Sequence, residues 1–140
     1  MFWTVLGTLA GAAIGMVGAI FVQRQSSRAD DLRFERSRLD RRREELRLEI
    51  NSFFAATQRA ERVAGQDVPR ASKEDAAEEM WASHKRLTVL VDEGLKGAAD
   101  SYCNQLGECL WSPTDEPTWQ RIGESSREFR RLASEALAAD

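Results

Sequence analysis

The side chains capable of catalysis or metal binding are few in this sequence. Its 140 residues include one histidine, His84, and two cysteines, Cys103 and Cys109, in the spacing CxxxxxC. A structural zinc site needs four such ligands, and a di-iron site in a helical bundle needs repeated Glu-x-x-His motifs. The residue three positions before His84 is Trp81. We therefore expect neither a bound metal nor a cofactor.

Catalytic motifs are also absent from the sequence, which has no P-loop, no dinucleotide-binding fingerprint and no Gly-x-Ser-x-Gly elbow. His84 lies on the apolar stripe of a predicted helix, which favours a core or boundary role over that of a ligand or base. We expect that the protein is not an enzyme. A small hydrolase or transferase would need an open polar cleft in which His84 lies beside Cys103 or a carboxylate.

The first 22 residues contain no charged side chain. As a helix rising 1.5 Å per residue they would measure roughly 33 Å, which matches the hydrocarbon thickness of a bilayer. A signal peptide, the main alternative, would have a basic start and an apolar stretch of only about 7 to 15 residues. We predict a transmembrane helix at residues 1–23.

Arginines follow this uncharged run directly, and basic residues that flank a span stay on the cytoplasmic side of the membrane. We therefore predict a single-pass inner-membrane protein whose C-terminal domain is cytoplasmic. Between Arg24 and Glu49 there are nine arginines and seven acidic residues, a net charge of only +2, so nucleic acid is not an expected partner. The arginines expected to fix the topology and contact anionic lipids are Arg24, Arg28, Arg33, Arg36 and Arg38.

Small residues recur at every fourth position of the predicted span, which places them on one face of a helix. Such a stripe lets two helix backbones approach closely and associate in the membrane. The alternative is that glycine is simply common in membrane helices. We predict a homo-oligomer whose helix contacts are made by Gly7, Gly11, Gly15 and Ala19.

Beyond the span, the sequence favours helices throughout. A helix is predicted over about residues 24–64, with an apolar seam at Leu32, Leu39, Leu46, Phe53 and Ala60. A second is predicted over about 73–106, begun by a capping box of Ser72 and Asp75 and stopped by Gly107. A third is predicted over about 116–138, capped by Asp115, with an apolar face that includes Trp119 and Phe129.

These elements predict an all-α fold: a transmembrane helix, a long charged helix and an antiparallel three-helix bundle, with residues 24–140 as the cytoplasmic helical or coiled-coil domain. A second helix of about 34 residues would run nearly back to the bilayer. Trp111 would then lie near the headgroups as an interface anchor. The alternative for Trp111 is that it plugs the end of the bundle.

The order of apolar span, arginine-rich helix, "MWASHKRLTVLVDEGLKGAADSYCNQL" and "PTWQRIGESSREFRRLASEAL" resembles a loose group of small bacterial membrane-anchored helical proteins. The resemblance covers the whole chain and implies no catalytic residues. We expect a membrane-anchored interaction or scaffold protein that self-associates through the glycine stripe and binds membrane lipids and a protein partner. The alternative is a membrane-perturbing effector of the holin or toxin kind.

Overall fold

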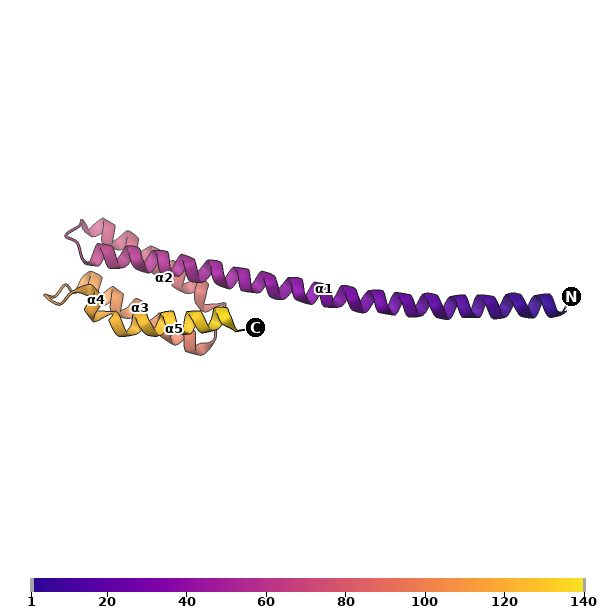
Figure 1. Ribbon diagram of the computed structural model, residues 1–140. Coiled ribbons are helices and arrows are strands. Elements are labelled where there is room, and N and C mark those ends of the chain that lie inside the picture. Colours follow the sequence, from indigo (N-terminus) through magenta and orange to yellow (C-terminus); the bar gives the residue numbers. More distant parts are fainter. Residues whose placement is uncertain (1, 140) are drawn as a thin grey trace. The chain divides into compact units, whose positions relative to one another are not determined.

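The computed structural model describes the backbone of residues 2–139 and the side chains of residues 18–139. Within that range every regular element is a helix, so the predicted all-α class is confirmed. Contacts divide the chain into two compact units, which we call unit 1 (Met1–Arg42) and unit 2 (Arg43–Asp140). The helices are α1 (Phe2–Ala64), α2 (Arg70–Thr88), α3 (Glu93–Trp111), α4 (Thr118–Arg121) and α5 (Gly123–Ala138) (Figure 1).

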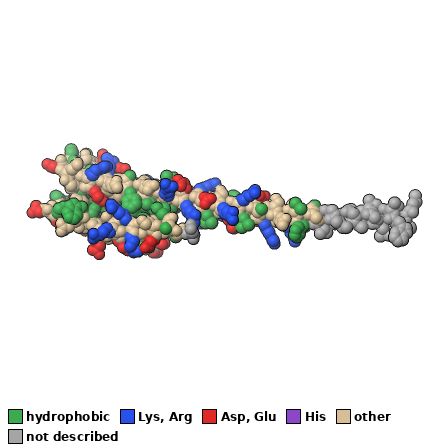
Figure 2. Space-filling model, viewed as in Figure 1, with side chains coloured by type: hydrophobic (Ala, Val, Ile, Leu, Met, Phe, Trp, Pro, Cys, Tyr) green, Lys and Arg blue, Asp and Glu red, His purple; other side chains and the backbone are tan. Residues whose placement is uncertain are grey.

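Unit 1 is the part of α1 that ends at Arg42, and its side chains from residue 18 onward are all exposed. Figure 2 shows acidic and basic side chains interspersed along it. Leu32 and Leu39 of the predicted seam are 57% and 58% exposed. Residues 24–42 therefore belong to unit 1, and unit 2 begins at Arg43. The predicted domain boundary at residue 24 stays a prediction.

The predicted span at residues 1–23 lies mainly outside the described side chains. Across the residues whose side chains are described, no helix has an apolar stretch long enough to cross a membrane. The backbone of residues 2–23 is helical, as part of α1.

Unit 2 is built around four long helical segments, counted over the described residues: residues 43–64 of α1, then α2, α3 and α5. Successive segments run in opposite directions (Figure 1). The sequence predicted three segments. The rings of Phe53, Tyr102 and Phe129 meet at the centre, with centroids 4.6 to 6.1 Å apart, and so join α1, α3 and α5. Arg86 joins α2 to α1 through Glu49, with 3.2 Å between Nε and Oε2.

The interior of unit 2 is apolar and its few polar groups are bonded. Burial of large apolar side chains supplies about 1.5–3 kcal/mol each and is the main stabilising contribution. The Thr57 hydroxyl donates to the carbonyl oxygen of Phe53 at 3.0 Å, and Ser83 donates to that of Met80 at 2.8 Å. The largest fully buried side chains include Tyr102, Phe53, Phe129, Ile50, Met80, Leu87, Leu106 and Leu110.

Helix α1 ends at Ala64, as predicted, but α2 begins earlier than expected. Its N-cap is Pro69, whose carbonyl oxygen accepts the amide of Ser72 at 3.0 Å. Ser72 therefore lies inside the first turn, and the predicted capping box with Asp75 is wrong. The extended backbone of Pro69 (φ −56°, ψ 148°) already supplies the geometry that starts a helix.

The predicted helix at 73–106 is divided into α2 and α3 by the turn at residues 89–92. Asp92 begins α3, because its carboxylate accepts the amide of Leu95 at 2.9 Å. This bond satisfies one of the amides left unpaired at a helix start, and so favours a new helix over continuation of the old one. Gly107 does not stop α3, which continues to Trp111.

Replacing Asp92 with alanine should lower the free energy of unfolding of unit 2 by about 1 kcal/mol, because the Leu95 amide loses its partner. Asp115 is the matched control, since it was predicted to cap a helix whereas Pro117 precedes α4. Its replacement should change the free energy by less than about 0.5 kcal/mol. Urea titrations of both variants measure the difference, and equal losses would contradict the assigned cap.

The third predicted helix, 116–138, is also divided. Ile122 separates the single turn α4 from α5, and its side chain is buried. Trp119 and Phe129 therefore lie on different helices, α4 and α5, and do not share one continuous apolar face. Trp119 is 72% exposed, whereas Phe129 is fully buried. The prediction that Trp119 belongs to the core is therefore wrong.

Candidate functional site

His84 of α2 and Asp100 of α3 are in hydrogen-bonding contact through Nε2 and Oδ1. The histidine side chain is only 13% exposed, and Trp81 packs edge-on against its ring with centroids 5.2 Å apart. The predicted boundary position of His84 is thus confirmed, and a carboxylate lies beside it. The pair joins α2 to α3 at their contact.

The thiol of Cys103 is buried and ionises less readily than an exposed thiol. Its side chain is fully buried, and the loss of solvent, with a smaller effect of the Asp100 charge, raises its pKa to about 12. Cys109 is 3% exposed, and burial raises the pKa of its thiol as well. Since the thiolate is the reactive form, both residues act as small apolar side chains.

Tyr102 carries the one polar group in the central ring cluster. Its hydroxyl donates to Oε1 of Glu61 on α1. Burial is the main reason that the pKa of Tyr102 is raised, and the bond with Glu61 adds to the effect. The sequence gave no sign that Glu61 is the partner of Tyr102, because the two residues lie 41 positions apart.

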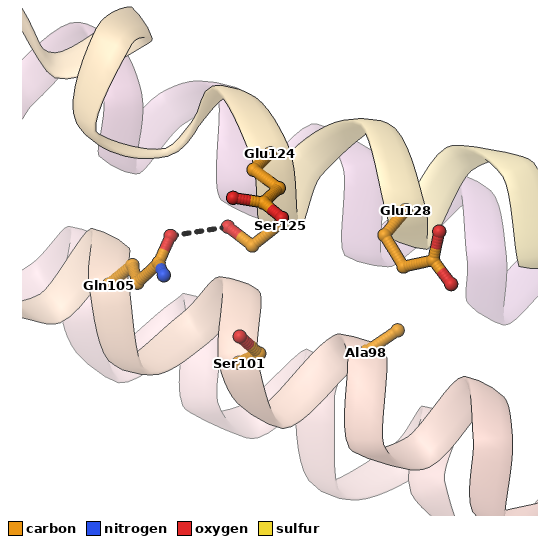
Figure 3. Close-up of a pocket in the computed structure, with 6 residues that line it drawn as sticks. All are labelled: Ala98, Ser101, Gln105, Glu124, Ser125 and Glu128. Carbon is orange, nitrogen blue, oxygen red and sulfur yellow. Dashed lines mark hydrogen bonds between the residues drawn. The ribbon is translucent and has the colours of Figure 1, made fainter.

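An open polar groove of about 310 Å³ lies between α3 and α5 (Figure 3). At one end the Ser125 hydroxyl donates to Oε1 of Gln105 at 2.6 Å. At the other, Glu128 is paired with Arg131 at 2.6 Å, and this bond is the main reason that the pKa of Glu128 is lowered. The groove therefore offers hydroxyl, amide and carboxylate contacts. Its lining residues are Ala98, Ser101, Gln105, Glu124, Ser125 and Glu128.

Metal ligands do not gather in the described part of the chain. Over those residues, no group of three or more His, Cys, Asp or Glu side chains could hold a metal ion. His84 and the α3–α5 groove are separate features, because neither His84 nor Asp100 lines that groove.

The residues predicted to contact the membrane have exposed side chains wherever these are described. Gly7, Gly11 and Gly15 lie outside the residues with described side chains, although their backbone belongs to α1. Ala19 is exposed. The arginines predicted to contact lipid all lie in unit 1 and are exposed: Arg24, Arg28, Arg33, Arg36 and Arg38.

Trp111 ends α3 and is 48% exposed, with the guanidinium carbon of Arg70 5.9 Å from its ring centroid. Arg70 begins α2, so Trp111 lies at the end of unit 2 opposite to Arg43. The long second helix expected to return Trp111 toward the bilayer does not form, because the chain reverses between α2 and α3. The role of Trp111 as an interface anchor stays a prediction, and it is no longer supported by a long helix that returns toward the bilayer.

Sequence reasoning missed an exposed apolar patch in unit 2. It consists of Leu48 on α1 with Val89 and Leu90 at the end of α2, which are 59%, 83% and 41% exposed. We call these three residues the turn patch. The signal in the sequence was the run "TVLV" directly before Asp92, where a turn usually carries polar residues.

Comparison of the chain with known proteins finds no matching family model, curated protein or solved structure. The resemblance to small bacterial membrane-anchored proteins stays a prediction.

Proposed function

We propose that this protein is a single-pass membrane-anchored interaction module. Residues 1–23 span the inner membrane, unit 2 lies in the cytoplasm, and the spans associate through Gly7, Gly11, Gly15 and Ala19. The observation that carries the proposal is the uncharged run of Met1 to Val22, followed at once by the arginine-rich helix.

The backbone conformation of the proposed span supports this assignment. Residues 2–23 are helical, and a helix satisfies all of its backbone hydrogen bonds internally, as the interior of a bilayer requires. The arginines that follow are exposed and so available to anionic headgroups, each adding about 1 kcal/mol near the membrane surface.

The character of unit 2 supports binding as its activity. It has its own apolar core, its thiols are buried, and its exposed features are a polar groove and an apolar patch. A pore-forming effector would need little beyond its spans, whereas a domain of this size suits contacts with other proteins.

The glycine stripe and the anchor can be tested on the same samples. Replacing Gly11 and Gly15 with isoleucine should abolish self-association in a membrane reporter assay, since branched side chains keep the backbones apart. Replacing Ala13 with isoleucine is the matched control, because residue 13 lies on the opposite face of the helix, and this variant should associate normally.

Alkaline carbonate washing of the same membranes then tests the anchor itself. The full chain and both variants should stay in the pellet, whereas a chain lacking residues 1–23 should be released. Release of the intact chain would overturn the proposed function. Retention with unchanged association of the double variant would overturn only the role of the glycines.

A further inference from the structure

The turn patch lies where one face of α1 adjoins the end of α2 and the turn that follows it. On α1, Glu45, Leu48 and Glu49 are three and four residues apart and so share one face. Arg86 is in the last turn of α2, and Val89 and Leu90 follow in the turn. These six residues line one open groove of about 420 Å³. The contact between Arg86 and Glu49 holds α1 and the end of α2 side by side.

The exposure of these apolar side chains indicates that another surface binds over them. Single exposed apolar residues are ordinary on protein surfaces, but adjoining ones with a polar rim mark sites of interaction. The carboxylate of Asp92 caps α3 directly after the turn that carries Val89 and Leu90. Both side chains in that turn are exposed. The rim is charged, with acidic residues on the α1 side and Arg86 on the α2 side.

We propose that the partner on the turn patch is a second copy of this chain. A two-fold axis parallel to α1 and α2 would place the α1 face of one copy over Arg86, Val89 and Leu90 of the other. Glu45 would then meet the partner's Arg86, which keeps its contact with Glu49 of its own chain. Leu48 would pack against the partner's Val89. Opposite charges and apolar side chains would thus be matched on both sides of the axis.

This symmetry keeps the two chains parallel, which is the arrangement that two copies anchored in one membrane require. The inference rests on the proposed function in that respect. A patch of this size is small for a stable interface in solution. Anchoring raises the effective concentration of the second copy, so a weak contact can still be occupied.

Cysteine cross-linking in membranes tests the predicted pairing. Two tagged full-length chains are co-expressed, one carrying Leu48→Cys and the other Val89→Cys. Mild oxidation should yield a mixed dimer. The control pairs Leu48→Cys with Trp119→Cys, because Trp119 is also well exposed, at 72% against 83% for Val89, but lies near the opposite end of unit 2. A mixed-dimer yield no higher than in the control would overturn the proposal.

A charge reversal distinguishes a specific contact from chance collision. Adding Glu45→Arg to both chains should lower the mixed-dimer yield roughly fivefold, because two arginines would then face each other. An unchanged yield would also overturn the proposed pairing. Carbonate washing of the membranes that carry only the Leu48→Cys and Val89→Cys pair tests the anchor separately. Absence of the mixed dimer from that pair, with full membrane retention, contradicts the patch alone.

Discussion

Replacement of Phe53 with alanine is expected to lower the free energy of unfolding of unit 2 by about 3–5 kcal/mol. The Phe53 side chain is fully buried, and its ring lies 4.6 Å from that of Phe129 and 6.0 Å from that of Tyr102. Removing the ring leaves a cavity where α1, α3 and α5 meet. Since domains are commonly stable by only about 5–15 kcal/mol, this loss should bring unit 2 close to unfolding.

Helix α1 offers a matched control for this change. Phe34 lies on the same helix but in unit 1, and its side chain is 67% exposed. Its replacement with alanine should change the free energy of unfolding by less than about 0.5 kcal/mol. Urea titrations followed by circular dichroism measure both variants. Similar small losses in the two would show that Phe53 is not at the centre of the core.

The second large effect is expected in the reactivity of Cys103. In a chain with Cys109→Ser, Cys103 is the only thiol, and its reaction with an aromatic disulfide reagent near pH 8 should be on the order of a thousandfold slower in the folded than in the urea-unfolded state. Burial raises the Cys103 pKa to about 12, so very little thiolate is present in the folded protein. Equal rates in the two states would contradict its burial.

The raised pKa of Cys103 also predicts how stability depends on pH. The pKa of Cys103 is higher in the folded than in the unfolded protein. The protonated thiol therefore makes its full contribution to the free energy of unfolding below the unfolded-state pKa of about 8.5. This contribution is lost as the pH rises through about 12. Burial raises the pKa of Tyr102 in the same direction. Urea midpoints measured at increasing alkaline pH should therefore fall, and Cys103→Ala should reduce the fall.

Periodicity in the sequence predicted the helical segments well, and Phe53 and Phe129, which lie on two predicted apolar faces, are buried. Periodicity could not predict which residues of an apolar face are buried by other helices. Leu39 and Phe53 belong to the same seven-residue repeat, yet only Phe53 meets other helices of unit 2. The repeat fixes the direction in which a side chain points, whereas burial depends on segments distant in the sequence.

The breaks between helices were harder to predict, because the competing local interactions are individually small. The apolar stripe continues through residues 89–92, so only the capping bond of Asp92 favours a new helix there. The sequence also predicted that a helix ends at Gly107, whereas α3 continues to Trp111. A glycine often follows the end of a helix but can also lie inside one. The polar pairs of the candidate site, such as His84 with Asp100, require the reversal at Asp92 and so could not be seen in advance.

Gly97 and Gly107 both lie within α3, and a methyl group at either position would meet no atom within 4 Å. Neither has a positive φ. The fold therefore carries flexible residues where alanine would fit without any rearrangement. Alanine at either position would therefore be expected to raise the free energy of unfolding, because it loses less backbone entropy on folding than glycine does. Natural proteins are commonly below the highest stability that their fold allows.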